Sequence, residues 1–547
     1  MQDILRAAVD SRFALRLRLG TDSLLALMCL YWAMTSNRAF LVAANQAWRG
    51  QPGSLVLLVV LVALLHYVLL APLIQRRWAK PALMLLSLVA AVGGHFTQAF
   101  GTAFDPAMLR NAMRTDWPEA RELLSGGLFA HVLVVLVPAW WFTLQVELVP
   151  AGKGWRAALP ALGRWLLAAV AASALLACAY QPLSGLMREK RELRYQLMPA
   201  APIWSLPRSM KAAQAAPGPR EPIGLDAKAG PSWSATARPR VLVLVVGETV
   251  RAANWGLREL EDGGTRDTTP LLRQESGLLN WPAVSTCGSD TETSLPCMFA
   301  PVGRRDYDES RIRRQESLLH VLARAGVQVR WLDNQSGCKG VCDAATEEVL
   351  ACDGGRCLDG ALFDRVQAVL RDARPSTTQL LVLHMLGNHG PAYHRRVPEQ
   401  FAPYAPVCSE DAFGSCERAA IVNAYDNALR YTDVLLASLW QGLKAANGGV
   451  DTAMIFLPDH GESLGEHGLF LHGLPYAIAP REQLQVPMLM GISPSWAAAR
   501  GWGGDCLGRL PEQPASHEHL FHTVLDLLDV RTALRDPRWS LLAACAA

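Results

Sequence analysis

Hydrophobic residues are concentrated in the first third of this 547-residue chain, and this uneven distribution limits the folds available to it. Long apolar runs cover Ser54–Ile74, Ala82–Phe100, Gly127–Val146 and Leu162–Tyr180. Each run is near the ~20 residues that a helix needs to cross a bilayer. A fifth run, Leu24–Ala44, is interrupted by Asn37 and Arg38. The sequence therefore predicts an α-helical membrane domain of about five transmembrane helices in residues 1–183.

Basic residues indicate the orientation of this membrane domain. Counted in chain order, with Leu24–Ala44 first, the runs have basic residues at three places. These lie before the first run (Arg6, Arg12, Arg16 and Arg18), between the second and third (Arg76, Arg77 and Lys80) and between the fourth and fifth (Lys153, Arg156 and Arg164). Loops rich in Lys and Arg stay in the cytoplasm. We find no small-residue cleavage site, which favours a retained anchor over a cleaved signal peptide. Five spans then place the chain after about residue 183 outside the cytoplasm.

Cysteine positions agree with that orientation. Cys29 and Cys178 fall in apolar runs, and the other ten cysteines follow residue 286. Four close pairs suit short-loop disulfides in an oxidising compartment: Cys287/Cys297, Cys338/Cys342, Cys352/Cys357 and Cys408/Cys416. Cys506 and Cys545 are left over and could pair, and the sequence does not fix the connectivity. A zinc site built from the Cys-x3-Cys and Cys-x4-Cys spacings is the alternative, but these spacings differ from the usual zinc patterns.

The remaining chain divides into a bridge and a soluble domain. Residues 184–206 mix charges with apolar anchors, and residues 207–238 are rich in Ala, Pro and Gly, so we expect a bridging helix and a linker over residues 184–238. In residues 239–547, predicted strands (Val241–Val246, Gln328–Leu332, Gln379–Leu383, Ala453–Leu457 and Val486–Gly491) alternate with predicted helices (Glu316–Ala325, Asp359–Asp372, Arg418–Ala446 and His519–Leu528). This alternation predicts an α/β domain, a mostly parallel sheet with helices on both faces.

Side chains that bind metals follow two of these strands. Glu248 comes just after the first strand, and Asp459 and His460 come just after the run ending at Leu457. Ligands bind at the carboxyl ends of strands in such sheets, so these three side chains can meet at one point. Carboxylates and an imidazole form a plausible zinc shell.

Further reactive groups accompany this set. The segment between Cys287 and Cys297 is dense in hydroxyl groups, any of which is a candidate nucleophile beside a metal ion, and spacing alone does not choose among them. His389 follows the strand Gln379–Leu383, and His472 lies in the glycine-rich loop after His460. We expect both histidines to lie at the site.

Several motifs together carry a family resemblance. They are Gly247-Glu248-Thr249-Val250-Arg251, Thr268-Thr269-Pro270, Cys287 through Pro296-Cys297-Met298-Phe299, Gly337-Cys338-Lys339-Gly340-Val341-Cys342-Asp343, Gly387-Asn388-His389-Gly390-Pro391, and Asp459-His460-Gly461-Glu462-Ser463-Leu464-Gly465-Glu466 with Leu471-His472-Gly473. With these motifs the chain resembles the bacterial phosphoethanolamine transferases of the alkaline phosphatase superfamily, which modify lipid A and include the mobile colistin (polymyxin) resistance enzymes. The resemblance covers nearly the whole chain.

The resemblance implies roles for individual residues. Glu248, Asp459, His460 and the nucleophile, Thr291, would hold one Zn²⁺, and a second ion is possible. His389 and His472 would contact the phosphoryl group or that second ion. Substrate-binding positions would be Ser336 and Lys339 together with a polar trio, Asn111, Thr115 and Glu119, whose spacing places all three on one face of a helix.

The implied reaction transfers phosphoethanolamine from phosphatidylethanolamine to a lipopolysaccharide acceptor, lipid A or a core sugar, through a covalent intermediate on Thr291. The implied protein is a monomer of the inner membrane with its catalytic domain in the periplasm, among membrane lipids. The small net charge of +3 names no nucleic-acid partner. Alternatives are a phosphoglycerol transferase or sulfatase-like hydrolase on the same metal core, or a catalytically inactive membrane sensor or assembly protein.

Two departures from the family pattern affect the site. Asp290 and Glu292 flank Thr291, whereas many relatives carry Ser and Ala there, so we expect added negative charge beside the nucleophile and an altered acceptor preference. His467 stands where some relatives have Asn, which offers a spare metal ligand.

Overall fold

The chain folds into two compact units, which we describe separately. The computed structural model describes residues 17–48, 53–115, 117–150, 155–189, 191–214, 220–234, 237–258, 266–343, 346–350, 352, 357–409 and 416–545. The first unit contains the described residues up to Arg110 together with Leu124–Met210, and the second contains Asn111–Leu123 and the described residues from Lys211 onward. Four of the orienting basic residues, Arg6, Arg12, Arg16 and Lys153, lie outside the described residues.

The first unit is built from apolar helices. Among the described residues, three are long and apolar enough to cross a membrane: α5 (Ala79–Phe100), α8 (Gly126–Gln145) and the part Ala158–Cys178 of α9 (Trp155–Cys178). The pair α2 (Thr21–Thr35) and α3 (Arg38–Ala47), bent by 71°, counts as a fourth when taken together. α4 (Ser54–Leu70) is apolar but only 17 residues long. Each predicted run is therefore helical, and length supports three or four spans.

The bend between α2 and α3 lies where the sequence interrupts the apolar run. Asn37 stands at the bend and is buried. Its Nδ2 donates to the carbonyl oxygens of Trp32 and Met198, each at 2.8 Å, and its Oδ1 accepts from the Met198 amide at 2.8 Å. Unpaired polar groups are costly in a hydrocarbon environment. The Asn37 side chain at this break is therefore hydrogen-bonded through both its amide nitrogen and its amide oxygen.

The bridge is more helical than its composition suggests. α10 (Tyr180–Glu189) and a 3-10 turn, Arg191–Gln196, precede α11 (Ala200–Gln214). α11 continues through Pro207, where the linker was expected to begin. The expectation of a linker from residue 207 is therefore wrong for its first residues, because most residues after Pro207 (Arg208, Met210, Lys211, Ala212, Ala213 and Gln214) are good helix formers.

The second unit contains a seven-stranded mixed sheet. Its strand order is β5-β12-β9-β4-β8-β6-β7. The bounds in chain order are β4 (Arg240–Val246), β5 (Leu278–Ser285), β6 (Gln328–Asp333), β7 (Glu347–Val349), β8 (Thr378–His384), β9 (Asp451–Phe456) and β12 (Gln485–Ile492). Neighbours from β9 to β7 are parallel, whereas β12 runs antiparallel to β9 and β5. All five predicted strands are present, and β5 and β7 were not predicted.

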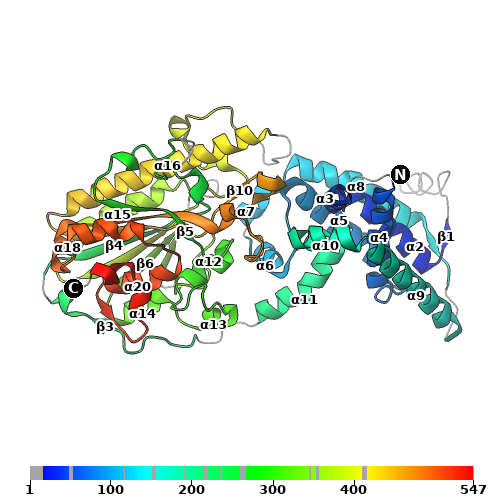
Figure 1. Cartoon of the computed structure of the whole chain (residues 1–547), viewed down its shortest axis with the longest axis horizontal. Helices are drawn as coiled ribbons and strands as arrows, with labels where there is room; N and C mark the ends of the chain where they lie inside the picture. Colours follow the sequence, from blue (N-terminus) through cyan, green and yellow to red (C-terminus); the bar gives the residue numbers. More distant parts are fainter. Residues whose placement is uncertain are drawn as a thin grey trace, which may run out of the picture. The chain divides into compact units, whose positions relative to one another are not determined.

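Helices cover both faces of this sheet (Figure 1). They include α14 (Leu318–Arg324) and α20 (Glu518–Leu527) on one face, and α15 (Gly360–Arg371) and α16 (Arg418–Ala446) on the other. Alternate residues of β4 point into the two cores: Leu242 and Leu244 pack on the α20 side, and Val241 and Val243 on the α16 side. A strand buried on both faces reads as a continuous apolar run. The predicted α/β architecture is confirmed.

Candidate active site and metal centre

The site lies at the carboxyl ends of the three central parallel strands. β4 lies between β9 and β8, so Glu248 after β4, Asp459 after β9 and His389 after β8 all emerge at one edge. Gly387 allows the loop after β8 to approach: its φ is +49°, and an added Cβ would lie 2.8 Å from the Glu248 carbonyl oxygen. Only glycine tolerates that backbone and that distance.

Glu248, Asp459 and His460 form a buried cluster whose ligand atoms all lie within 4.8 Å of one another. We call these three residues the strand wall. All three are fully buried. His460 Nδ1 lies 2.9 Å from the Gly461 carbonyl oxygen, to which it donates, so Nε2 keeps its lone pair for the cluster.

An unsatisfied carboxylate oxygen makes the cluster fit for a cation. Asp459 Oδ1 accepts from the backbone amides of His460 at 2.8 Å and Thr249 at 3.3 Å. Its Oδ2 is buried and has no hydrogen-bond partner among the described residues. Leaving a buried carboxylate oxygen without a partner is costly. Two carboxylates and one imidazole form a donor set that fits Zn²⁺.

The protonation states of the strand wall suit metal binding. Burial raises the pKa of the Asp459 carboxyl, but His460 and hydrogen bonds more than offset this, so the pKa lies below its ordinary value. Burial lowers the pKa of the His460 imidazole despite the neighbouring Asp459. At neutral pH the pair is therefore a carboxylate and a neutral imidazole, the forms that bind metals.

Thr291 is the hydroxyl that faces the strand wall. It is the first residue of α12 (Thr291–Met298), and the Cys287–Cys297 disulfide closes the surrounding loop. Its Oγ1 lies 3.3 Å from Glu248 Oε2 and 3.3 Å from His460 Nε2. Of the other hydroxyls, Ser289 donates to the Leu474 carbonyl. The structure thus identifies Thr291, among the hydroxyl groups of this segment, as the one beside the metal-ligand cluster, a choice that spacing alone did not make.

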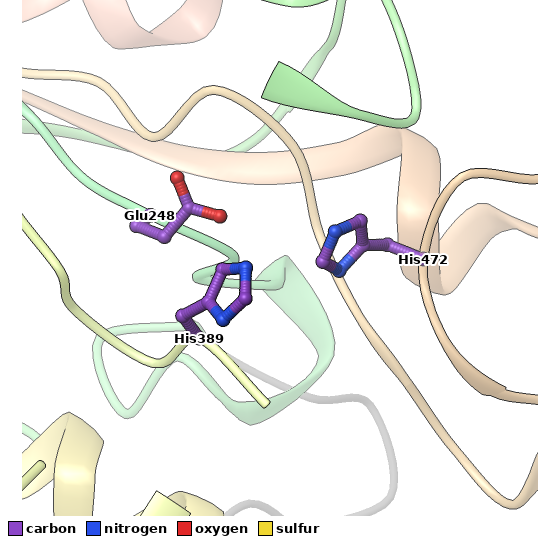
Figure 2. Close-up of side chains that lie close together, drawn as sticks. All are labelled: Glu248, His389 and His472. Carbon is purple, nitrogen blue, oxygen red and sulfur yellow. The ribbon is translucent and has the colours of Figure 1, made fainter. Parts of the chain in front are cut away.

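His389 and His472 extend the cluster beyond the strand wall. One ligand atom each from Glu248, His389 and His472 lie within 4.8 Å of one another, and Figure 2 shows these side chains around a common space. The two imidazole rings make an edge contact at 5.5 Å between centroids. This second trio fits either a second ion or phosphoryl oxygens.

Glu462, which sequence reasoning left without a role, orients His472. Its Oε2 accepts from His472 Nδ1 at 2.8 Å, and its Oε1 accepts from the Tyr393 hydroxyl at 2.6 Å. Burial and then Glu462 raise the pKa of Tyr393 well above its ordinary value, so its hydroxyl remains a donor. A carboxylate that fixes a histidine in this way is a common support of metal sites. The Asp-His-Gly-Glu block contained this residue but no signal of its function.

All of the predicted substrate-binding residues except Glu119, whose side chain lies outside the described residues, line one cleft with Thr291. The lining residues are Asn111, Arg114, Thr115, Asp290, Thr291, Glu292, Gln335, Ser336, Lys339, His389 and His472. Lys339 donates to the Ser336 hydroxyl at 2.5 Å, and Gln335 donates to Glu248 Oε2 at 3.1 Å.

The polar trio does not lie on one helix. α6 (Pro106–Arg114) ends before Thr115, and α7 (Trp117–Glu122) begins two residues later. The Glu119 side chain lies outside the described residues. The expectation of one continuous helical face is therefore wrong, because Thr115 follows the end of the first helix and the second begins at Trp117, with Pro118 in its first turn, a position that suits proline.

Basic residues neutralise the negative charge expected beside Thr291. Glu292 contacts a set that we call the basic wall: Arg114 and, at 3.4 Å each, Arg313 and Lys339. Burial raises the pKa of Glu292, but Lys339, Arg114 and Arg313 outweigh it, so the pKa lies below its ordinary value and the group is ionised. Asp290 caps α12 by accepting from the Thr293 amide at 3.0 Å.

Disulfides use all ten cysteines that follow residue 286. The four close pairs Cys287–Cys297, Cys338–Cys342, Cys352–Cys357 and Cys408–Cys416 are joined, and so are Cys506 and Cys545. Glu347 also lies near Cys338 and Cys342, but the disulfide occupies both sulfur atoms, which removes the alternative of a cysteine zinc site there. His467 is exposed and belongs to none of the metal-ligand groups found among the described residues.

Comparison with known proteins places both units in context. Residues 240–530 match the sulfatase family model, and residues 55–213 match the model for phosphoethanolamine transferase EptA/EptB. The phosphoethanolamine transferase EptA of Escherichia coli (strain K12) is 32% identical over 482 residues, covering 85% of each chain. The phosphatidylethanolamine transferase Mcr-2 of Escherichia coli is 34% identical, covering 85% of this chain and 88% of that one.

A solved structure extends this likeness to nearly the full length. The integral membrane lipooligosaccharide phosphoethanolamine transferase A from Neisseria meningitidis matches with a TM-score of 0.88 and 30% identity, covering 97% of this chain and 99% of that one. Its separate soluble domain matches with 38% identity and a TM-score of 0.56, covering 60% of this chain. The chain is therefore a multi-pass membrane enzyme with a soluble domain, and it belongs to the phosphoethanolamine transferase family.

Proposed function

We propose that the enzyme moves phosphoethanolamine from phosphatidylethanolamine to a lipopolysaccharide acceptor, lipid A or a core sugar. The observation that carries this proposal is the Thr291 hydroxyl, which lies within 3.5 Å of both Glu248 and His460 in a buried cluster that fits zinc. Relatives named for lipid A phosphoethanolamine transfer support the choice of acceptor.

In the first half-reaction, Thr291 Oγ attacks the phosphorus of the donor. The Oγ–P bond forms as the P–O bond to glycerol breaks, and the hydroxyl proton ends on the departing diacylglycerol. Glu248, Asp459 and His460 would hold Zn²⁺, which when bound lowers the pKa of a nearby hydroxyl and offsets charge on phosphoryl oxygens. Thr291 is also the first residue of a helix, where the helix dipole favours negative charge.

In the second half-reaction, an acceptor oxygen attacks the phosphothreonine. The new O–P bond forms, the Thr291 Oγ–P bond breaks, and the acceptor's proton returns to Thr291. His472, fixed through Nδ1 by Glu462, presents Nε2 to the cleft and is placed to move this proton. Asn111, Ser336 and Lys339 line the same cleft and would hold the donor headgroup.

The compartment follows from the disulfides and the lipid substrates. Five disulfides persist in an oxidising environment, which supports a periplasmic location for the second unit and an inner-membrane location for the first. Anchoring keeps the catalytic residues at the surface where both lipids are found and raises their effective concentration. We propose that the enzyme acts as a monomer.

Mass spectrometry of lipopolysaccharide from cells with and without the chain tests this function. We expect a gain of one phosphoethanolamine on lipid A or the core with the wild-type chain, and none with Thr291→Ala. Thr293→Ala, which removes a hydroxyl from the same helix, is the matched control and should retain the gain. Wild-type cells without the adduct, or adduct formation by Thr291→Ala, would contradict the proposal.

A further inference from the structure

A second cavity adjoins the Thr291 cleft. It has a volume of about 260 Å³, against about 40 Å³ for the cleft itself, and shares Arg114 and Lys339 with it. Its floor is apolar and includes Phe299, Ile312 and Val341. Arg220 and Arg313 also line it. The cavity therefore opens beside the reacting centre and offers more room than the cleft.

The cavity carries an excess of positive charge. Among the described residues, four cationic side chains (Arg114, Arg220, Arg313 and Lys339) and one acidic side chain (Glu316) line it, and Glu292 lines the adjoining Thr291 cleft. Glu316 forms an ion pair with Arg324, which lies outside the lining, at 2.7 Å. Glu292 alone is shared among the three residues of the basic wall. The acidic side chains thus leave part of the positive charge without compensation.

Arg220 contacts a histidine and a backbone carbonyl group at the wall of this cavity. Its Nη1 lies 3.0 Å from His320 Nε2, and its Nη2 lies 3.4 Å from the Cys342 carbonyl oxygen. Arg313 also pairs with Glu309 at 3.1 Å and donates to the Glu292 carbonyl oxygen at 2.7 Å. Arginine is well suited to phosphate, because its planar guanidinium presents paired donors.

This charge excludes one class of ligand and favours another. The donor's ethanolamine group is a cation, which a wall of cations repels. Acyl chains gain nothing from charged walls, and the volume is below the ~300 Å³ at which pockets for whole small molecules begin. A sugar phosphate fits instead: its anion faces the arginines and its ring faces the apolar floor.

We propose that this cavity holds a phosphate group of the acceptor beside Thr291, and that Arg220 and Arg313 determine acceptor specificity. The inference rests on the proposed function and deepens it, because it selects phosphorylated over unphosphorylated acceptors. Inorganic phosphate shares the relevant chemistry and serves as a probe. Arg220 and Arg313 line this cavity but not the Thr291 cleft, so they act on the acceptor, whereas Lys339 lines both and also serves the donor.

Steady-state kinetics of the full chain in detergent test the proposal. The probes are phosphatidylethanolamine and lipid A, the latter with both phosphates or with one removed. We expect Arg220→Gln to raise the KM for the bisphosphorylated acceptor about tenfold or more, since a hydrogen bond to a charged group contributes ~1.5–3 kcal/mol. The ratio of acceptor transfer to diacylglycerol release should fall to the same extent. Inorganic phosphate should compete with the acceptor in wild type and much less in Arg220→Gln.

Matched variants separate recognition from folding. Arg314→Gln, in the same short helix as Arg313, removes an exposed arginine that does not line the cavity and should leave the acceptor KM unchanged. Arg313→Lys should retain more affinity for the acceptor than Arg313→Gln, because one charge remains. Thermal melting of each variant shows whether it is folded.

The outcomes distinguish the two proposals. If wild type forms no phosphoethanolamine adduct on Thr291, the proposed function fails and this inference falls with it. If wild type transfers but Arg220→Gln keeps the wild-type acceptor KM and phosphate inhibition, the inference alone is overturned. A change in the donor KM rather than the acceptor KM would assign the cavity to the donor and also overturn it.

Discussion

The two walls beside Thr291 are built by different means. The strand wall comes from the ends of adjacent parallel strands, is fully buried, and is oriented by backbone hydrogen bonds. The basic wall comes from a helix end, a short helix and a loop, and its side chains Lys339, Arg313 and Arg114 remain 10%, 25% and 40% exposed. The strand wall is therefore held in place by the sheet, whereas the basic wall is held by ion pairs that substrates and salt can rearrange.

Asp459→Asn should have the largest effect, because it removes charge from the strand wall while keeping its shape. We expect transfer to fall by roughly 10³-fold or more and bound zinc to be lost, since the unsatisfied Oδ2 is no longer an anionic ligand. Metal analysis of the purified chain and a transfer assay measure both. Asp451→Asn, at the opposite end of the same strand, is the control and should keep its zinc. Full zinc content with full activity in Asp459→Asn would refute the strand wall as a metal site.

His517 joins the disulfide-closed loop that carries Thr291 to the segment after β9, and it should make the protein sensitive to acid. Its Nδ1 accepts from the Cys287 amide at 3.1 Å, and its Nε2 donates to the Pro458 carbonyl at 2.9 Å. Burial lowers the pKa of His517 to about 4. The unfolded chain takes up the proton first, so stability is lost as the pH falls from about 6.5 to 4, by up to about 3 kcal/mol.

Thermal melting between pH 7 and pH 4.5 with a metal chelator present measures this effect. His517→Gln, whose amide offers both a donor and an acceptor but does not titrate, should lose less stability on acidification than wild type. His467→Gln, which replaces an exposed histidine, should follow the wild-type curve. If His517→Gln lost as much stability on acidification as wild type, protonation of His517 would not be the cause of the loss.

Glu462→Gln should lower activity by a smaller factor than Asp459→Asn, because it removes support from His472 beside the strand wall. The buried carboxylate accepts from both His472 and Tyr393, and an amide can accept only with its single oxygen. Supporting residues of this kind contribute roughly 10- to 100-fold in activity or metal affinity. We expect kcat to fall within that range, measured with saturating donor, while the exposed Glu512→Gln retains wild-type turnover. Equal rates for Glu462→Gln and wild type would mean that His472 needs no such support.

The sequence predicted the strand wall because its signals are local. Continuous apolar runs such as Val241–Val246 identify buried strands, and the residue after such a run must appear at the sheet edge. β5 was missed because Pro282 interrupts its run and the strand lies at an edge with mixed burial. Glu462 was missed because only the folded loop shows which carboxylate accepts from His472.

The basic wall was beyond sequence reasoning for a different reason. Arg114, Arg313 and Lys339 are separated by long stretches of chain and share no periodicity, and nothing local indicates that they meet at Glu292. The sequence did single out Glu292 as extra negative charge beside Thr291. The sequence did not show that three cationic side chains surround this carboxylate. Because they neutralise Glu292, the expected excess of negative charge beside Thr291 is absent.

Asp290 offers the smallest expected effect and a sharp test of whether chemistry is confined to the strand wall. It stands next to Thr291, yet the hydrogen bond found for its side chain goes to α12. As the N-cap it accepts from the Thr293 amide at 3.0 Å, so Asp290→Ala should cost ~1 kcal/mol of stability. Asp290→Ser, which keeps a capping oxygen, should recover most of that loss in a urea titration. Because the carboxylate caps a helix instead of meeting the reacting atoms, transfer by Asp290→Ala should fall less than about fivefold, the factor that ~1 kcal/mol represents. A hundredfold loss of transfer activity in both variants would instead mean that the Asp290 charge acts on the phosphoryl group. The start of α12 would then share the chemistry that we assign to the strand wall.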